Sequence, residues 1–279
     1  MSSRNRDSAA ISPTAHYTAQ IWIRNGLSDP RLDTRKGRLY WYALEPLAII
    51  LRALRGPTLQ DFLLARHELI DLRLSEAIDA GQVTQVIEIA AGLSPRGLRF
   101  VKKYGSRITY IEADLPGMAA HKRALLGATV ASHRIVSINA LADDGPDSLA
   151  TLVTSLDRTQ GVAIITEGLL NYFDDASVTG MWRRFVAATS GFPRLLYLSD
   201  IHVRGNNDNA LSRLFMNVLS AFVRGRVHLH FDSTADVERE LRAAGFATAH
   251  AHDPHDFAEH LPSCRAKWAS LVRIIDAGS

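Results

Sequence analysis

VTQVIEIAAGLSPRG, from Val83 to Gly97, is the stretch on which the fold of this chain depends. A β-branched apolar run ends in Ala90-Ala91-Gly92, and Ser94-Pro95 then suits the start of a helix. The pattern predicts a buried parallel strand, a tight glycine turn and a helix. Gly92 has no Cβ and tolerates positive φ, and the start of a helix offers unpaired N–H donors, so we expect a nucleoside cofactor at this turn.

This turn lacks the stricter nucleotide-binding motifs. A G-x-G-x-x-G fingerprint is poorly matched because only Gly92 and Gly97 are present, and no G-x-x-x-x-G-K-[ST] run occurs. Glu88 instead fits the looser first motif of class I methyltransferases, whose cofactor carries a sulfonium and a free amino group. The alternative is an ordinary β-α turn of a doubly wound domain.

The composition is that of a globular protein. The 279 residues are 47% hydrophobic and 22% charged, enough for one large α/β domain or two small ones. A net charge of +3 with scattered arginines does not favour nucleic-acid binding. The single cysteine, Cys264, excludes an internal disulfide and fits a reducing compartment. We expect no metal site.

Targeting signals are not evident in the sequence. The first twenty residues lack a basic segment followed by an apolar core, and no apolar run approaches the roughly 18 residues of a membrane span. We therefore expect a soluble, cytoplasmic protein without a membrane partner.

The N-terminal part of the chain is predicted to be helical. We expect a flexible tail over 1–11, a helical cap or lid over 12–82 and the core over 83–279. The predicted helices lie near Ala15 to Ser28, Gly37 to Leu54 and Thr58 to Ala80. Their aromatic side chains could line a pocket for a flat substrate or simply pack against the core: Tyr17, Trp22, Tyr40, Trp41 and Tyr42.

Carboxylates mark the ends of the next strands. Arg107 to Asp114 is predicted as the second strand, with Glu112 and Asp114 on the same face. Both could accept hydrogen bonds from ribose hydroxyls, and Asp114 is favoured because ligands of open α/β sheets bind at the carboxyl ends of strands.

Later strands alternate with helices. The predicted strands are His133 to Asn139, Gly161 to Glu167, Arg194 to Asp200, Gly245 to about His250 and Ser270 to Ile275. A helix from Asn209 to Arg224 and a short strand from Val227 to Phe231 are also expected. This order predicts an α/β fold: a seven-stranded, mostly parallel sheet with helices on both faces, whose last two strands pair antiparallel.

Four stretches carry a resemblance to a known family: LLARHELID (Leu63 to Asp71), VIEIAAGLSPRG (Val86 to Gly97), YIEADLPGMAAHKR (Tyr110 to Arg123) and TEGLLNYF (Thr166 to Phe173). From about Ser12 to its C-terminus the chain resembles the leucine carboxyl methyltransferases, especially the bacterial polyketide-type carboxyl O-methyltransferases. The resemblance implies the Rossmann-like class I fold and S-adenosylmethionine (SAM) as cofactor, with S-adenosylhomocysteine (SAH) as product.

The resemblance also implies roles for individual residues. Arg66 would hold the carboxylate of SAM, Glu167 its amino group and Asp114 its ribose, and each charge pairing is electrostatically favourable. Relatives usually have an aspartate where this chain has Asn139, which weakens the expected adenine contact there. The full cofactor set is Arg66, Ala90, Ala91, Gly92, Asp114, Leu115, Asn139, Ala140, Leu141 and Glu167.

We expect O-methylation of the carboxylate of a small aromatic or polyketide-like acid, by a protein that could be a homodimer. A carboxylate is ionised near neutral pH, so the enzyme needs alignment and exclusion of water rather than a strong base. Tyr172 and Asn171 are the catalytic candidates. The substrate-binding candidates are His16, Tyr17, Trp22 and His202.

Other functions stay open. A phenol or alcohol acceptor would need a general base such as His202, His228 or His230. A nicotinamide-dependent reductase, a SAM-binding module without turnover, and methylation of a protein C-terminal leucine are further alternatives.

Overall fold

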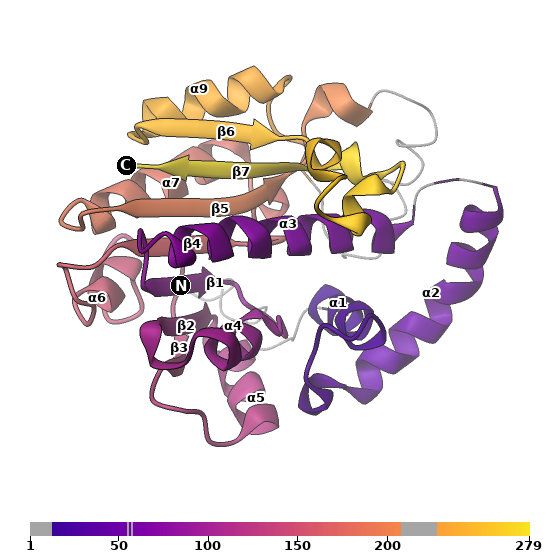
Figure 1. Ribbon diagram of the computed structural model, residues 1–279, viewed down its shortest axis with the longest axis horizontal. Coiled ribbons are helices and arrows are strands. Elements are labelled where there is room, and N and C mark those ends of the chain that lie inside the picture. The colour runs from indigo at the N-terminus through magenta and orange to yellow at the C-terminus, as the bar shows by residue number, and fades with distance from the viewer. Residues whose placement is uncertain (1–12, 55, 57, 208–227) are drawn as a thin grey trace, which may run out of the picture. The chain divides into compact units, whose positions relative to one another are not determined.

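Seven strands form one sheet in the order β3-β2-β1-β4-β5-β7-β6 (Figure 1). The computed structural model describes residues 13–54, 56, 58–207 and 228–279. The strands are β1 Gln85–Ile89, β2 Thr109–Asp114, β3 His133–Ser137, β4 Val162–Thr166, β5 Leu195–Ile201, β6 Thr248–His252 and β7 Arg273–Gly278. Strand β2 pairs in parallel with β1 and β3, and β4 with β5, whereas β7 is antiparallel to β5 and to β6. The predicted α/β fold and its antiparallel C-terminal pair are confirmed.

The chain forms two compact units. The first comprises the described residues up to Leu44 together with Gln85–Leu156, and the second comprises the described residues of Glu45–Thr84 and Asp157–Ser279. Helix α2, Arg35–Ala53, begins in the first unit and ends in the second. The domain boundary expected near residue 83 stays a prediction.

The first unit is built on β1, β2 and β3. Its helices are α1 Pro13–Arg24, α4 Arg96–Tyr104, α5 Pro116–Leu126 and α6 Leu149–Val153, with 3-10 turns at Pro30–Leu32 and Gly105–Arg107. Ala19 of α1 packs with Leu93, Met118 and Leu126, so α1 covers the turn after β1 and packs along α5. Every residue of β1 is buried, as expected for a central parallel strand, and this includes the polar Gln85 and Glu88.

The second unit places helices on both faces of its strands (Figure 1). Helix α3, Leu59–Asp79, contacts β5 and β7, while α7, Asp175–Thr189, packs Phe185 against Tyr197 of β5. Because successive side chains of a strand point to opposite faces, Tyr197 meets α7 whereas Asp200 meets α3. Helix α9, Thr234–Ala244, covers β6. Short 3-10 turns lie at Leu170–Tyr172, Arg204–Asn207, Pro254–Phe257, Pro262–Arg265 and Ala269–Leu271.

Two segments depart from the sequence-based expectations or lie beyond them. The strand expected up to Phe231 is reduced to a single parallel bridge between His230 and Val203. The N–H groups of His228 and His230 donate to the carbonyls of Asn171 and His202, which lie in loops. These donors are therefore not paired with a neighbouring strand. The predicted tail and the helix expected from Asn209 to Arg224 lie outside the described residues.

Among the helices that the structure describes, none combines the length and the apolar character that a bilayer-spanning segment requires.

Candidate functional site

The turn after β1 brings backbone N–H groups to the carboxylate that ends β2. Ala90 and Gly92 have positive φ angles of 55° and 50°. The Gly92 N–H donates to Asp114 Oδ2 over 2.7 Å. A Cβ on Gly92 would lie 3.4 Å from the Cβ of Ala15, so α1 closes over the turn. The turn has the left-handed backbone that its glycine predicts.

Asp114 accepts two backbone hydrogen bonds and can still accept others. Its other oxygen, Oδ1, accepts the N–H of Leu115 over 2.7 Å, and the residue is partly exposed. Burial raises the pKa of Asp114, while the bonds from Gly92 and Leu115 lower it. Each carboxylate oxygen has a further lone pair, so Asp114 can still accept from the hydroxyls of a sugar.

Glu112, the competitor of Asp114, lies inside the unit. Its carboxylate is 2.7 Å from Lys122 Nζ and 3.3 Å from His133 Nε2, and it is shielded from solvent. Burial would raise the pKa of Glu112, but Lys122 and His133 hold it below its ordinary value. Of the two carboxylates, Asp114 is therefore the one that can meet a ligand.

Glu88, the acidic residue of the first motif, is a structural group in this fold. It is buried, and its oxygens accept from Arg96 Nη1 over 2.6 Å and from the Tyr110 hydroxyl over 2.8 Å. Burial, and then Glu88, raise the pKa of Tyr110 well above its ordinary value. The ion pair between Glu88 and Arg96 joins β1 to the start of α4.

The loop after β3 carries the residues expected at the adenine. Asn139 is exposed, and its Oδ1 accepts the N–H of Leu141 over 3.0 Å. Leu141 is 37% exposed. The loop therefore offers an apolar surface, while the acceptor of Asn139 stabilises its own turn.

In the second unit, Arg66 lies between two carboxylates. Its Nε donates to Glu167 Oε1 over 3.0 Å, and its Nη1 donates to Asp200 Oδ2 over 2.9 Å. Burial would lower the pKa of Arg66, but Asp200 and Glu167 hold it above its ordinary value. The structure thus brings together Arg66 and Glu167, which the resemblance assigns to the two charged groups of a methionyl portion.

His67 supports Glu167 from the neighbouring position of α3. Its Nδ1 lies 2.9 Å from Glu167 Oε2, and its side chain is fully buried. Glu167 is thereby held through both oxygens, one by Arg66 and one by His67.

Gly168 lets the guanidinium approach the main chain. Its φ is 68°, and a Cβ there would come within 2.9 Å of Arg66 Nη2. The Gly168 N–H donates to Asp200 Oδ1 over 2.6 Å. A glycine is required by both the backbone angle and the space.

The acceptor candidates after β4 differ in exposure. Tyr172 is 42% exposed, and its hydroxyl is close enough to Arg66 to interact electrostatically with it. Asn171 has a buried Oδ1 with no hydrogen-bond partner among the described residues. A buried amide oxygen is costly to leave unpaired, which marks the surroundings of Asn171 as incompletely satisfied among the described residues.

The remaining substrate candidates are core residues in this structure. His16, Tyr17 and Trp22 are buried, and His16 Nδ1 lies 2.8 Å from Thr34 Oγ1. His202 is buried, its Nδ1 bonds the carbonyl of Leu271 over 2.8 Å, and burial lowers its pKa.

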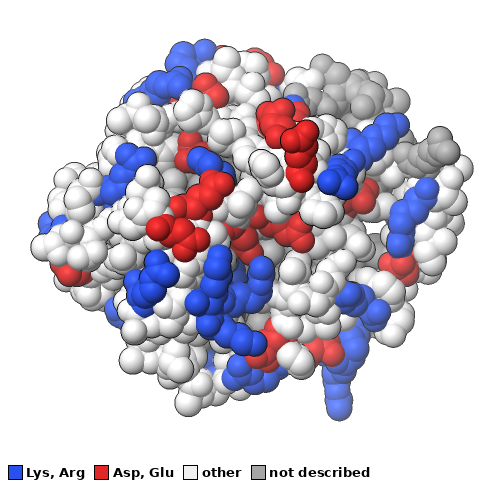
Figure 2. Space-filling model, viewed as in Figure 1, with Lys and Arg blue, Asp and Glu red and all other residues white. Residues whose placement is uncertain are grey.

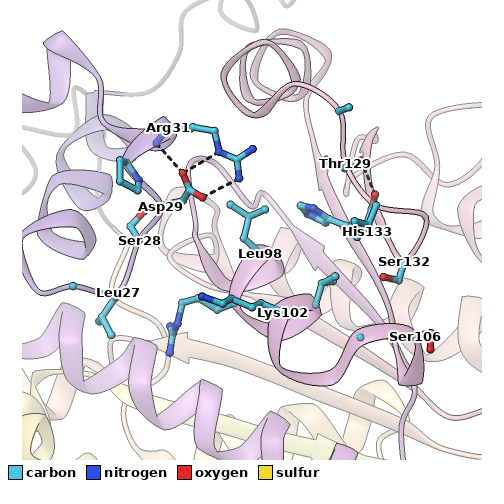
Figure 3. Close-up of a pocket in the computed structure, with 17 residues that line it drawn as sticks. Leu27, Ser28, Asp29, Arg31, Leu98, Lys102, Ser106, Thr129, Ser132 and His133 are labelled. Atoms are coloured by element: carbon cyan, nitrogen blue, oxygen red, sulfur yellow. Dashed lines mark hydrogen bonds and ion pairs between the residues drawn. The ribbon is translucent and has the colours of Figure 1, made fainter.

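A pocket of about 780 Å³ lies beside α4 in the first unit (Figure 3). Its wall includes Lys102, His133 and Arg31, whose guanidinium is paired with Asp29 at 2.8 Å. Basic side chains gather over α4, which carries Arg99, Lys102 and Lys103 (Figure 2). None of the predicted cofactor or acceptor residues lines this pocket.

Two residues of the site, Asp200 and His67, are not predicted by the sequence analysis. Asp200 ends a predicted strand just as Asp114 does, so the same rule could have selected it. His67 had no such signal, because only the fold brings it to Glu167.

Comparison with solved structures shows the same fold in several proteins. A putative methyltransferase from Thermobifida fusca is 12% identical and superimposes with a TM-score of 0.64 over 98% of this chain and 97% of its own. A DUF574 family protein from Streptomyces avermitilis is 14% identical, with a TM-score of 0.64 over 98% of both chains. The CMeT domain of a citrinin polyketide synthase is 12% identical, with a TM-score of 0.56 over 96% of this chain and 65% of its own. No curated protein matched.

The family match together with the fold defines the class: the protein is a SAM-dependent methyltransferase with a seven-stranded α/β core. Residues 32–185 match the family model of the leucine carboxyl methyltransferases. The match spans more than half of the chain, and the protein belongs to that family.

Proposed function

We propose that the protein transfers the methyl group of SAM to a carboxylate oxygen of a small aromatic or polyketide-like acid. Bound SAM supplies an electrophilic methyl group, and its transfer to a carboxylate leaves a methyl ester and SAH. The family and the fold support the methyl donor.

The described residues fit such a donor. In the first unit, Asp114 keeps lone pairs for ribose hydroxyls, and Leu141 offers apolar surface for adenine. In the second unit, Arg66 would bind the carboxylate of the methionyl group, and Glu167 would accept from its ammonium. The Gly92 turn permits close approach of the backbone, with Ala90, Ala91 and Leu115 beside it.

The engagement of two candidate bases is the observation that favours a carboxylate acceptor. His230 Nδ1 lies 2.6 Å from Asp175 Oδ1, and its Nε2 lies 3.0 Å from the carbonyl of Leu170, so both ring nitrogens face acceptors. His202 is buried, and it bonds Leu271. His230 therefore has no ring nitrogen left to take a proton from a phenol, and burial disfavours the charged form of His202 that such a transfer would create. A carboxylate needs no such transfer.

The protein's own residues would then orient the acid substrate. Tyr172 and Asn171 lie in the turn after β4 and would position the acid by donating the phenol O–H and the amide N–H to its carboxylate, which only accepts. Holding the oxygen in line with the methyl carbon and excluding water would provide most of the rate acceleration.

A panel of matched acceptors tests this function. Each aromatic acid is offered beside the phenol of the same skeleton, and methyl transfer from SAM is followed by mass spectrometry. We expect methyl esters from the acids, and a rate that is flat with pH above about pH 6 because the acid is already ionised. Phenol ethers formed with a rate that rises through the range of histidine titration would replace this proposal by the phenol alternative.

His228 separates the two acceptors further, because neither of its ring nitrogens bonds an acceptor in the described part of the chain, whereas His230 is engaged at both nitrogens and His202 at Nδ1. His228→Gln should leave ester formation within about twofold, and it should lower phenol methylation by about 100-fold or more if His228 is a base. SAM binding without turnover of any acceptor would identify a binding module instead.

A further inference from the structure

Asp200 connects Arg66 to the loop that follows β4. The side chain is completely buried, at the carboxyl end of β5 on the face toward α3. Oδ2 accepts from Arg66 Nη1 over 2.9 Å, and Oδ1 accepts the Gly168 N–H over 2.6 Å. One carboxylate therefore fixes a side chain and a main-chain segment at once.

A second carboxylate at Arg66 needs a physical reason, since burying a charge is costly and Glu167 already neutralises this arginine. The geometry supplies one. Glu167 holds the guanidinium at Nε and Asp200 holds it at Nη1, so two points of a rigid plane are fixed. The direction of Nη2, which lies against Gly168, is thereby determined.

Without Asp200, Arg66 would keep a single contact and regain rotamer freedom. An unanchored arginine loses rotamer entropy when it binds a carboxylate, whereas an anchored one has already lost it in folding. The same change would release the Gly168 N–H, and with it the loop that carries Glu167.

We propose that Asp200 is a positioning residue for the amino-acid end of SAM: it orients Arg66 and the Glu167-Gly168 loop without contacting the cofactor. This inference rests on the proposed function, because Arg66 and Glu167 are taken there to bind the methionyl charges. It adds a residue that the resemblance does not assign.

The test compares Asp200→Asn with a matched control, Asp276→Asn. The amide that replaces the Asp200 carboxylate could keep an acceptor for Gly168 but would lose the ion pair with Arg66. Asp276 pairs with Arg73, a second arginine of α3, at 2.7 Å from Nε, so its replacement removes a similar helix-to-sheet ion pair outside the site. Both variants are first checked for folding by circular dichroism and thermal unfolding.

Binding of two probes is measured by calorimetry on the full chain. SAH carries the amino and carboxylate groups, and 5′-deoxy-5′-methylthioadenosine carries the same nucleoside without them. We expect Asp200→Asn to raise the dissociation constant of SAH by about 10- to 100-fold, the range for a hydrogen bond between charged groups. The dissociation constant of the truncated probe should change by less than about twofold. Asp276→Asn should change the dissociation constant of either probe by less than about twofold.

Different failures have different signatures. If wild-type protein binds SAH no better than the truncated probe, the assignment of Arg66 and Glu167 is wrong, and the proposed cofactor site fails. If wild type prefers SAH but Asp200→Asn binds it equally well, only the positioning role is overturned. Equal loss of both probes in Asp200→Asn also overturns it, since that marks general damage.

Asp200→Ser covers the case in which Asp200→Asn does not fold. Serine keeps a small acceptor for the Gly168 N–H and has no charge for Arg66. The same selective loss of SAH is expected, and wild-type affinity for SAH would contradict the proposal.

Discussion

At the scale of single residues, the site depends on where a side chain is absent as well as on charges. Gly168 has a φ of 68°, and its missing Cβ makes room for Arg66 Nη2. Gly81 has a φ of 69° with nothing within 4 Å of a hypothetical Cβ. Any other residue would be strained by the left-handed backbone at both positions. Only at Gly168 would its Cβ also meet a neighbouring side chain.

Gly168→Ala should therefore do more than strain the backbone. Both Gly168→Ala and Gly81→Ala are expected to lower the free energy of unfolding by about 1–2 kcal/mol, the cost of an L side chain in the left-handed region. Gly168→Ala should also weaken the binding of SAH by about tenfold, because the added methyl group displaces the guanidinium of Arg66. Denaturant unfolding and calorimetry measure the two effects. Equal SAH affinities in the two variants would refute the steric role of Gly168.

Single residues also show what the sequence can and cannot select. The acidic residue at the carboxyl end of β2 was found by its position, and the choice of Asp114 over Glu112 agrees with their burial in the structure. The aromatic residues Tyr17 and Trp22 were ambiguous, and they lie in the core. An amphipathic helix pattern does not say which buried side chain will face a cavity.

At the scale of elements, His16 links α1 to its neighbours. Its Nδ1 meets Thr34 Oγ1, which caps α2 by accepting from the Gly37 N–H, and its ring lies 5.9 Å from that of His121 on α5. Burial, then His121 and Lys36, lower the pKa of His16 from 6.5 to about 4. These three elements therefore pack around a neutral imidazole.

This packing should make stability depend on pH. Between about pH 4 and 6.5 the unfolded state binds a proton at His16 that the folded state does not, so the free energy of unfolding falls as the pH is lowered through this window and is fully retained above it. We expect His16 to contribute about 1–2 kcal/mol of the loss.

His16→Leu provides the comparison. Burial also lowers the pKa of His121, His202 and His252, so wild type alone cannot isolate one ring. Denaturant unfolding at several pH values should give His16→Leu a shallower fall than wild type between pH 6.5 and 4. Parallel curves would mean that His16 does not carry the dependence.

At the scale of the whole molecule, the proposed function distributes the two ends of SAM over two groups of residues. It assigns the nucleoside to the groups around Asp114 and the amino acid to those around Arg66. A ligand that carries both parts should therefore bind much better than either part alone, because the entropic cost of association is incurred once.

Thermal unfolding tests this distribution. SAH at 100 times its dissociation constant should raise the stability of the folded state by about 2.7 kcal/mol. Adenosine or methionine at the same concentration, and also the two together, should give a far smaller shift in Tm. A shift from adenosine equal to that from SAH would show that the groups around Arg66 take no part in binding.

The sequence alone determined the order of strands and helices, the left-handed turn at Gly92 and the carboxylates at the strand ends. These features depend on local patterns of apolar residues, glycine and strand termini, which a chain displays without folding. The sequence also carried the family's four motifs, and with them the class of reaction.

Only the tertiary structure decided which charges act together. Arg66 and Asp200 are 134 positions apart, and their contact exists because α3 packs on the face of β5 from which Asp200 projects. Glu88 and Glu112 became internal ion pairs for the same reason, since their partners lie on helices that cover β1 and β2. Pairing of buried charges depends on which elements meet in space, and no local pattern of residues encodes that meeting.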